Sequence, residues 1–416
     1  MTRHKGYSAM DRRLVGILTI TSILVAGCHG RPELSYTEWS RPGSSTAPST
    51  SSRFAAYVSA AQTAAAAAPK YTTVVSFTPG KKEACLKQIG PALRILSDGA
   101  LRTDLGYEFQ PTKPFTAPDY VAGWRLLGRG LVWKIEEAND AKDYDSAIRC
   151  TILATKFGLD LVAGSAMEAS LGMVIVDEAR REIACSLDYM TDTQLKTLAD
   201  GITVAVTRMP SLDVTIEHER MNMLAGVQAT QDAFVKEEWS RLVKTFGPDV
   251  RVAVDKLREM KGKDPAAAFA YFKGMADEAE GEVRYLEHVA NLPVAKRTEV
   301  EEPKVDASRP WRRFARHYFL TVRPLLRQYD ATLARTKLLV LESHLRGIKR
   351  ETGAYPSDLR QLPAALTTDP YSGTTFAYRA DGSDFRVYSV GEDLADDGGQ
   401  TDDSPTSLDL RIETRG

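Results

Sequence analysis

The sequence predicts a mainly α-helical protein: a solenoid-like body of helical hairpins, followed by a small α+β domain in which a long helix lies on a three-stranded antiparallel sheet. Apolar residues recur at spacings of three and four over most of residues 54–290, as on one face of a helix. A similar stripe follows at residues 331–348, and two segments of alternating polarity lie after it. With 416 residues, 43% hydrophobic and 26% charged, the chain has a globular composition and the length for two or three domains.

Residues 1–28 have the pattern of a secretory signal peptide. Two arginines at 12 and 13 precede the apolar run Leu14–Val25, which is too short to span a bilayer. The run ends in Leu24-Val25-Ala26-Gly27-Cys28, which resembles the bacterial lipobox because small residues precede the cysteine. This resemblance implies that Cys28 carries lipid and anchors the chain in a membrane. The alternative is an ordinary secretory signal with a chance cysteine.

The residues after the cysteine bear on where the protein resides. His29 follows Cys28, and the absence of aspartate at that position resembles the sorting pattern of outer-membrane lipoproteins. Residues 29–52 are rich in Ser, Thr and Pro, so they cannot bury a core and are expected to form a flexible tether. We therefore expect a cell-envelope protein that faces the periplasm or the exterior, in the outer rather than the inner membrane.

Residues 53–294 are predicted to form the helical domain. Helices are expected at 54–68 and 81–101, with a short strand at Tyr71–Phe77 between them because that segment is β-prone. Three more are expected at 118–138, 144–161 and 166–187, and a fourth begins where Thr191 and Gln194 form a capping box. The first of these three has an apolar face made of Tyr120, Trp124, Leu127, Leu131 and Ile135.

The paired helices loosely resemble tetratricopeptide-like arrays, as at Asp143-Tyr144-Asp145-Ser146-Ala147, although no constant period is kept. More broadly, the chain resembles bacterial lipoproteins of unassigned function that join a helical region to a pseudopilin-like tail. That resemblance carries no activity. Residues 295–308 are charged and poor in apolar residues, so they are expected to link the helical domain to residues 309–416.

The four cysteines are Cys28, Cys85, Cys150 and Cys185. No two are close in sequence, which excludes a zinc ribbon and a redox Cys-x-x-Cys motif. With Cys28 lipidated, Cys150 and Cys185 lie on neighbouring predicted helices and are the expected pair for a disulfide. Small buried thiols are the alternative.

The helical domain contains no recognisable catalytic motif. His218-Glu219-Arg220-Met221-Asn222 begins like a zinc-protease helix, but Asn222 stands where the second histidine ligand is needed. Gly164-Ser165-Ala166 lacks the glycines of a nucleophile elbow. We therefore expect a non-catalytic protein, and the alternative is an enzyme with an unrecognised site in the helical domain.

Several charged groups are interpreted as solvated helix faces. Glu136 with Glu137, and Glu178 with Arg180, would be carboxylate or ion-pair sites on the alternative interpretation. The basic and aromatic segment Trp311–Phe319 would contact lipid headgroups or an acidic partner, or pack its aromatic side inward.

The C-terminal residues 309–416 are expected to place a helix on a sheet. The helix ends at Thr352-Gly353, since glycine suits the left-handed position after a helix. Strands are expected at 374–379 and 385–390 with a turn at Asp381-Gly382, and a third strand at 408–412. The apolar stripe of the helix consists of Ala331, Ala334, Leu338, Leu341, Leu345 and Ile348.

This order of elements resembles the globular head of the type II secretion major pseudopilin. Tyr-Pro, Asp-Pro and Tyr-Ser-x-Gly occur in order and at suitable spacing. The matching residues are Gly353, Tyr355-Pro356, Leu359, Leu362, Asp369-Pro370, Gly373, Tyr378, Tyr388-Ser389, Gly391, Asp393, Gly398-Gly399 and Asp409. The resemblance covers the last fifth of the chain and implies an α+β fold and a link to secretion or pilus-like systems. The chain departs from pseudopilins because a lipobox and a long helical region replace the fibre-forming helix.

In the pseudopilin family the last loop binds calcium through aspartates and backbone carbonyls. By position, Asp393 and Asp409 match the family's aspartates, Val390 would offer a carbonyl, and Asp396 and Asp397 are further carboxylates. Between Gly391 and Leu410 there are seven carboxylates and no Lys or Arg, and calcium prefers oxygen ligands. The resemblance therefore implies Ca²⁺ here, whereas the residues alone indicate a disordered acidic loop.

The formal net charge of −1 is too balanced to favour nucleic acid as a partner. We expect a lipid-anchored cell-envelope protein that acts as a non-catalytic scaffold or binding module, with the membrane and an unidentified envelope protein as its partners. The first alternative is an accessory component of a type II secretion or pilus-like system, and the second is the enzyme named above.

Overall fold

The structure is a computed structural model that describes residues 52–107, 118–297, 300–301, 322–400 and 409–412. Cys28, the signal peptide, nearly all of the tether, and Trp311–Phe319 lie outside the described residues. The described part is mainly helical, with one small antiparallel sheet, in agreement with the predicted fold class at this level.

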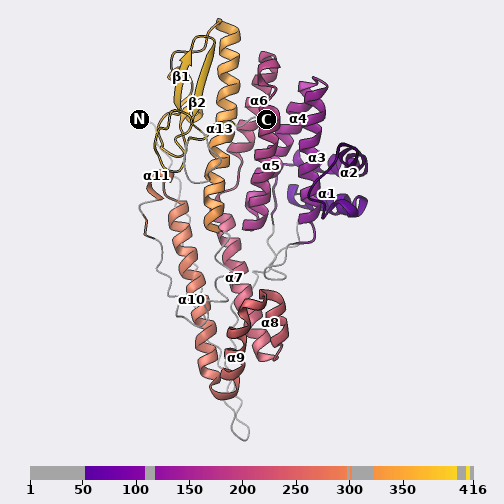
Figure 1. Ribbon diagram of the computed structural model, residues 1–416, viewed down its shortest axis with the longest axis vertical. Coiled ribbons are helices and arrows are strands. Elements are labelled where there is room, and N and C mark those ends of the chain that lie inside the picture. Colours follow the sequence, from indigo (N-terminus) through magenta and orange to yellow (C-terminus); the bar gives the residue numbers. More distant parts are fainter. Residues whose placement is uncertain (1–51, 108–117, 298–299, 302–321, 401–408, 413–416) are drawn as a thin grey trace, which may run out of the picture. The chain divides into compact units, whose positions relative to one another are not determined.

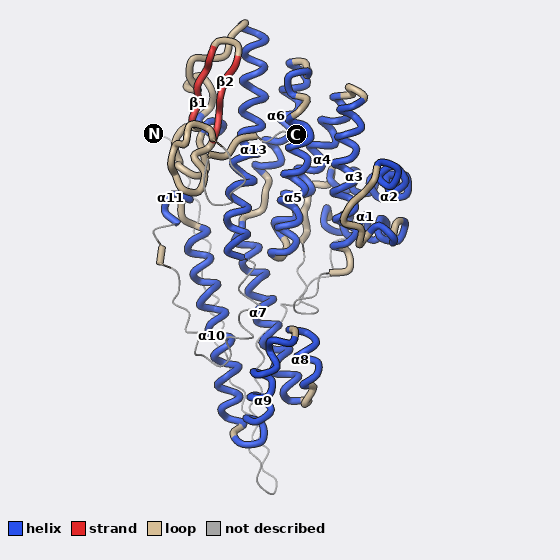
Figure 2. The backbone as a smooth tube through the Cα atoms, in the orientation of Figure 1, coloured by secondary structure: helices blue, strands red, loops and turns tan. Residues whose placement is uncertain are grey.

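The first helices pack around one hydrophobic core (Figures 1 and 2). A capping box of Thr191 and Gln194 precedes the sixth helix, as predicted. The helices are α1 (Arg53–Ala67), α2 (Pro79–Ala100), α3 (Val121–Asp140), α4 (Tyr144–Asp160), α5 (Ala166–Ala184) and α6 (Asp192–Thr207). Short 3₁₀ helices follow α1, α4 and α5 at Pro69–Tyr71, Leu161–Ala163 and Leu187–Tyr189.

Aromatic side chains fill the centre of this first core. Trp124 is fully buried on α3, donates from Nε1 to the carbonyl of Tyr57 at 3.0 Å, and meets the rings of Phe54 and Phe157. Such rings bury large areas and pack edge to face. The predicted apolar face of α3 is confirmed, because Leu127, Leu131 and Ile135 are also buried.

A buried ion pair ties α1 to α4. Arg53 donates from Nε and Nη2 to the two carboxylate oxygens of Asp160, at 2.9 and 3.1 Å, and Tyr57 Oη donates to the same carboxylate at 2.7 Å. Nη1 of Arg53 donates to the carbonyls of Arg102 and Thr103. Every charged group of this cluster therefore has partners, which is the condition under which a buried ion pair is tolerated.

The strand predicted at Tyr71–Phe77 is wrong. After the 3₁₀ helix this segment runs as a loop, and no strand of the described chain pairs with it. Arg129 of α3 donates to the carbonyl of Val74 at 2.6 Å, and the Phe77 ring lies 4.8 Å from that of Trp133. The β-prone side chains are thus used to pack on α3 rather than to join a sheet.

A second hydrophobic core lies among the next helices, where α7 and α10 pack along each other. Phe234 of α7 packs edge to face on Phe272 of α10, with ring centroids 5.3 Å apart. The helices are α7 (Leu212–Val235), α8 (Trp239–Phe246), α9 (Arg251–Lys263), α10 (Pro265–Ala290) and the short α11 (Val294–Arg297), with a 3₁₀ turn at Pro248–Val250.

The long helix α13 (Val322–Thr352) contributes to three cores. Leu325 and Leu326 at its start join the α7–α10 core, and Leu339 and Val340 join the core of α1–α6 through contacts with α5 and α6. The predicted stripe holds the third core: Leu338, Leu341 and Leu345 lie against the C-terminal residues. The helix therefore buries a second face that the stripe does not reveal. It ends as predicted, with Gly353 at a φ of 86° and its N–H bonded to the carbonyl of Lys349.

Residues 353–400 and 409–412, which we call the C-terminal module, contain a β-hairpin and one helical turn. Strand β1 (Ala377–Asp381) pairs antiparallel with β2 (Asp384–Tyr388), and the turn α14 (Ala364–Thr367) precedes them. The described residues form a two-stranded sheet in place of the three predicted strands. At the expected third strand, Leu410 forms an isolated bridge with Ser389, and Leu408 lies outside the described residues.

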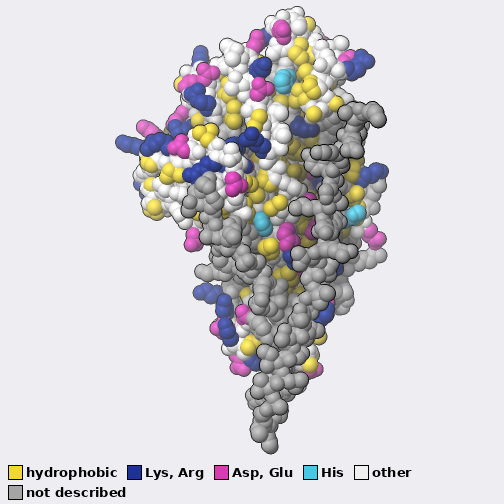
Figure 3. Space-filling view, turned by 180° about the vertical axis from the view of Figure 1, so that it is seen from behind, with side chains coloured by type: hydrophobic (Ala, Val, Ile, Leu, Met, Phe, Trp, Pro, Cys, Tyr) yellow, Lys and Arg dark blue, Asp and Glu magenta, His cyan; other side chains and the backbone are white. Residues whose placement is uncertain are grey.

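No described helix is long and apolar enough to cross a membrane. On the face shown in Figure 3, basic and acidic side chains are interspersed over the described surface rather than gathered by sign.

Candidate functional sites

A buried aspartate fixes the start of the acidic loop. Oδ1 of Asp369 accepts hydrogen bonds from the hydroxyl of Ser389 at 2.7 Å and from the N–H of Tyr371 at 3.0 Å, and Oδ2 accepts from the N–H of Val390 at 3.1 Å. Because this carboxylate is almost fully buried, its hydrogen bonds are stronger than on a surface. Asp369 therefore holds β2's end and the Asp-Pro turn together. In the sequence, Asp369-Pro370 was noted only as a match to the pseudopilin head, which did not indicate this role.

The predicted calcium ligands lie in the acidic loop and, for Asp409, in the segment that follows it. Asp393 Oδ1 accepts from the N–H of Ala395 at 3.1 Å, within its own turn. Asp396 Oδ1 accepts from Tyr388 Oη at 2.8 Å and from the N–H of Gly398 at 3.0 Å. Val390, the predicted carbonyl ligand, donates its N–H to Asp369.

Asp409 differs from these because it is buried and only one of its two carboxylate oxygens accepts a hydrogen bond. The residue is 2% exposed, and its Oδ2 accepts from the N–H of Gly399 at 2.6 Å. Its Oδ1 is buried and has no hydrogen-bond partner among the residues that the structure describes. Burial raises the pKa of Asp409, the backbone N–H groups of Gly399 and Asp397 lower it, and the nearby charges of Asp396 and Asp397 raise it. A buried carboxylate oxygen without a donor is costly, so a ligand that satisfies it would stabilise the module.

These residues fit a calcium ion in chemistry but not in full geometry. A buried carboxylate oxygen with no donor, beside two further carboxylates, is the kind of ligand that Ca²⁺ takes. Among the described residues, however, no three acidic, histidine or cysteine side chains converge on one point. Calcium there would be held by Asp409 with Asp396 or Asp397, and by carbonyl oxygens of the loop.

The expected disulfide is absent from the structure: Cys85, Cys150 and Cys185 are all free thiols. Cys150 on α4 is half-buried near the charges of Lys134 and Glu137 of α3, and burial raises its pKa. Cys185 is exposed at the end of α5, where its Sγ donates to the carbonyl of Arg181. α4 and α5 pack together, but one thiol is half-buried and the other is exposed. That two helices are neighbours therefore does not show that their cysteines can be bridged.

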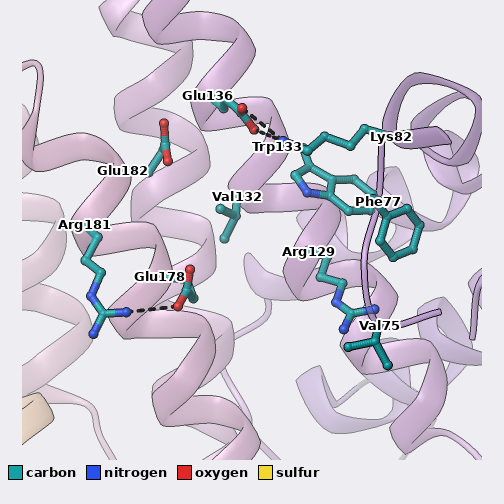
Figure 4. A pocket seen from close by; sticks show the side chains of 10 residues that line it. All are labelled: Val75, Phe77, Lys82, Arg129, Val132, Trp133, Glu136, Glu178, Arg181 and Glu182. Carbon is teal, nitrogen blue, oxygen red and sulfur yellow. Dashed lines mark hydrogen bonds and ion pairs between the residues drawn. The ribbon is translucent and has the colours of Figure 1, made fainter. Parts of the chain in front are cut away.

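A pocket of about 360 Å³ lies between α3 and α5, with the loop before α2 as its third wall (Figure 4). On one side of it the helices are in close contact, because a Cβ at Gly128 would lie 2.5 Å from Ile175. On the other side Asn139 Nδ2 donates to the carbonyl of Glu182 at 2.8 Å. The lining consists of Val75, Phe77, Lys82, Arg129, Val132, Trp133, Glu136, Glu178, Arg181 and Glu182.

Ion pairs lie at two edges of this pocket. Lys82 pairs with Glu136 at 2.6 Å, and Arg181 pairs with Glu178 at 3.1 Å. Glu178 thus pairs with Arg181 and not with Arg180, the partner considered from sequence. The interpretation as solvated faces missed the pocket because its residues come from three separate segments. Arg129 and Trp133 are four residues apart on α3 and therefore lie on the same face of the helix, but this spacing alone did not identify the pocket.

The two rejected motifs meet in a buried polar cluster. Glu168 Oε2 accepts from Tyr107 Oη at 2.6 Å and from the N–H of Ser165 at 2.7 Å, while Oε1 accepts from Tyr120 Oη at 2.8 Å. Glu219 of α7 accepts from the N–H of Ala166 at 2.7 Å. These bonds fasten α7 to the start of α5, where Ser165 and Glu168 form a capping box.

His218 lies at the side of this cluster, its ring 5.1 Å from that of Tyr107, and burial lowers its pKa. Burial raises the pKa of Glu219. The donors around Glu168 occupy both of its oxygens, so we interpret the group as a structural acceptor that joins three segments.

Comparisons of the chain with protein-family profiles, with curated proteins and with solved structures each find no match.

Proposed function

We propose that the protein is a lipid-anchored scaffold of the cell envelope that presents its C-terminal module on a rigid helical mount. The observation that carries this proposal is the sharing of α13 among three hydrophobic cores. A helix buried on several sides cannot move in one core without disturbing the others, because protein interiors are close-packed.

Polar contacts strengthen the same mount. Arg346 of α13 donates from Nε to the carboxylate of Asp188 at 2.8 Å, and Arg350 donates to the carbonyl of Asp188 at 2.9 Å. At the other end of the helix, Arg327 pairs with Glu392 of the acidic loop at 2.9 Å. The module is therefore fastened to α13 and α13 to the body at separate points, as a presenting scaffold requires.

Calcium in the acidic loop is part of this proposal, as a structural ion. Its support is the unpartnered, buried Oδ1 of Asp409. The ion would supply positive charge to a loop that has none of its own between Gly391 and Gln400, and would hold the loop closed against β2.

A link to a secretion or pilus-like system is a second candidate, favoured by the packing of the module. Residues that carry the pseudopilin resemblance, Tyr355, Leu359, Leu362 and Tyr378, all belong to the third core, and Tyr378 Oη donates to the carbonyl of Pro356 at 2.7 Å. We also propose a third strand at 408–412 and a solenoid-like repeat in the body. The bridge between Leu410 and Ser389 supports the third strand.

Cross-linking in intact envelopes, followed by mass spectrometry, tests the scaffold proposal. We expect the C-terminal module and the helical body to be joined to the same partner, and the Leu345→Asp variant, which loosens the module, to lose that adduct. An adduct with a secretion component would establish the accessory role. A wild-type chain that yields no adduct with another protein would contradict both.

The anchor is tested separately by fractionation. We expect the Cys28→Ala variant to leave the membrane fraction, and the Cys85→Ala variant, which removes a buried thiol, to stay with it. If the Cys28 variant also stays with the membrane in carbonate washes, the lipid anchor is refuted.

A further inference from the structure

The pocket between α3 and α5 plays no part in the scaffold function, yet its lining is chemically selective. Its lining includes the half-buried Arg129, whose guanidinium donates from Nη1 to the carbonyl of Val74 and lies 5.4 Å from the centre of the Phe77 ring. Among the described residues no carboxylate pairs with Arg129, in contrast to Lys82 and Arg181 of the same pocket. Its Nε and Nη2 donors are left for a ligand.

The charge around Arg129 favours an anion. Arg125 lies one turn earlier on α3, and its charge acts on Arg129 with the same sign. The planar guanidinium offers two parallel N–H groups, a geometry that matches a carboxylate. A half-buried arginine is also better shielded from competing water and salt than a surface one.

An apolar surface stands next to this donor. The rings of Phe77 and Trp133 lie 4.8 Å apart, and Val75, 88% exposed, adds a further apolar group at the rim. In Figure 4 these side chains and Arg129 lie on one side of Val132, and Glu178 and Arg181 lie on the other. The pocket volume of about 360 Å³ is within the range of small-molecule sites.

We propose that this pocket binds a carboxylate whose neighbouring carbon carries an apolar side chain. The carboxylate would pair with Nε and Nη2 of Arg129, and the side chain would lie on Phe77 and Trp133. A free N-acylated hydrophobic amino acid and the C-terminal residue of a peptide share this chemistry. The carboxylate at one end distinguishes both from neutral apolar molecules.

Calorimetric titration of the full-length protein in detergent tests the proposal with three probes. They are N-acetyl-phenylalanine, its neutral amide, and the peptide N-acetyl-Ala-Ala-Phe. We expect both acids to bind and the amide to bind about tenfold more weakly, since a charge-assisted bidentate pair is lost. Preference for the free acid over the tripeptide would identify a small-molecule site, and the reverse a peptide C-terminus site.

Two variants and one control locate the binding. Arg129→Met keeps the apolar stem on Phe77 and removes the guanidinium, so we expect affinity for the acids to fall about tenfold, to the level of the amide. Val132→Trp fills the pocket and leaves Arg129 in place, so we expect binding to be lost. Arg125→Met makes the same charge change outside the pocket lining and is expected to bind within about twofold of wild type.

The proposal is overturned if neither acid binds at millimolar concentration, if acid and amide bind equally, or if Arg129→Met binds like wild type. If Arg129→Met melts at a lower temperature than wild type, its loss of binding could come from misfolding. The Val132→Trp variant then tests the proposal, because unchanged affinity in this folded variant would show that the ligand binds outside the pocket. None of these outcomes alters the scaffold proposal, which rests on α13 and not on this pocket.

Discussion

Two buried aspartates show how differently the helical body and the C-terminal module are held together. In the body, Asp160 receives Arg53 and Tyr57 on both of its oxygens. In the module, Asp409 is equally buried, but one of its oxygens has no partner. Side chains therefore satisfy the carboxylate of Asp160, whereas one carboxylate oxygen of Asp409 is left without a donor. We infer that the Asp160 cluster is complete as folded and that the region around Asp409 is completed by an ion.

The largest loss of stability is expected when the buried ion pair of Arg53 and Asp160 is broken. Asp160→Ala leaves Arg53 buried without its carboxylate, and breaking such a pair costs about 3–5 kcal/mol. Urea unfolding of the full chain measures this loss, and we expect it to be the same with calcium and with chelator. The control Asp145→Ala, which removes an exposed bond to Gln194, should cost about 0.5 kcal/mol or less. A loss below about 1 kcal/mol in Asp160→Ala would refute the role of the pair.

The next effect tests whether α13 joins the two regions. Leu345→Ala opens a cavity in the third core and Leu339→Ala opens one in the first, each at a cost of about 2–4 kcal/mol. If α13 couples the cores, amide exchange in β1 and β2 should rise in both variants. Exchange that rises in the hairpin only for Leu345→Ala would show that the module moves independently of the body.

A smaller effect is expected at Asp409. Calcium should raise the melting temperature of the wild type, because an ion bound only by the folded state stabilises it. Asp409→Asn keeps an acceptor for Gly399 and turns an amide N–H₂ toward Asp396 and Asp397, so it should recover about 1–3 kcal/mol in chelator. In that variant the melt should no longer respond to calcium. A variant that still responds like the wild type would place the ion elsewhere.

A separate effect concerns pH, where α11 meets α13 through Arg297 and Asp330. Burial raises the pKa of Asp330 to about 7, against the lowering influence of its partner Arg297. A carboxyl with a raised pKa in the folded state stabilises the fold most below its unfolded pKa, near 4, and this contribution is lost as pH rises to 7.

The Asp330→Asn variant cannot ionise, so its stability should fall less than that of the wild type between pH 4 and 7. The difference in slope is at most about 1.4 kcal/mol per pH unit for one proton. Chemical denaturation at a series of pH values measures it. Parallel curves for the two chains would show that Asp330 stays ionised throughout, held by Arg297.

Several local features could be predicted from the sequence. The α3 face, the capping box at Thr191 and the Gly353 stop all follow from local spacing and backbone preference. α5 shows the limit. Val174 is 47% exposed although it is apolar, while Met173 and Ile175 beside it are buried. This helix contacts neighbours on several sides, so its apolar residues do not mark one stripe.

The sites were harder to predict, because they depend on contacts between distant segments. Arg129, Phe77 and Glu178 lie on three elements, and no short motif contains them. The unpartnered oxygen of Asp409 arises from how the loop folds over β2, which residue counts do not specify. Residue composition did identify the acidic loop itself, and Asp369 was noted only within the Asp-Pro match to the pseudopilin head.

Hydrogen exchange with and without calcium tests the contrast between body and module most directly. We expect calcium to slow exchange in residues 388–400 and 409–412, and to leave the ends of α1 and α4 around Arg53 and Asp160 unchanged. Equal exchange in the module under both conditions, or slowing spread evenly over the body, would contradict the claim that the module alone is completed by an ion.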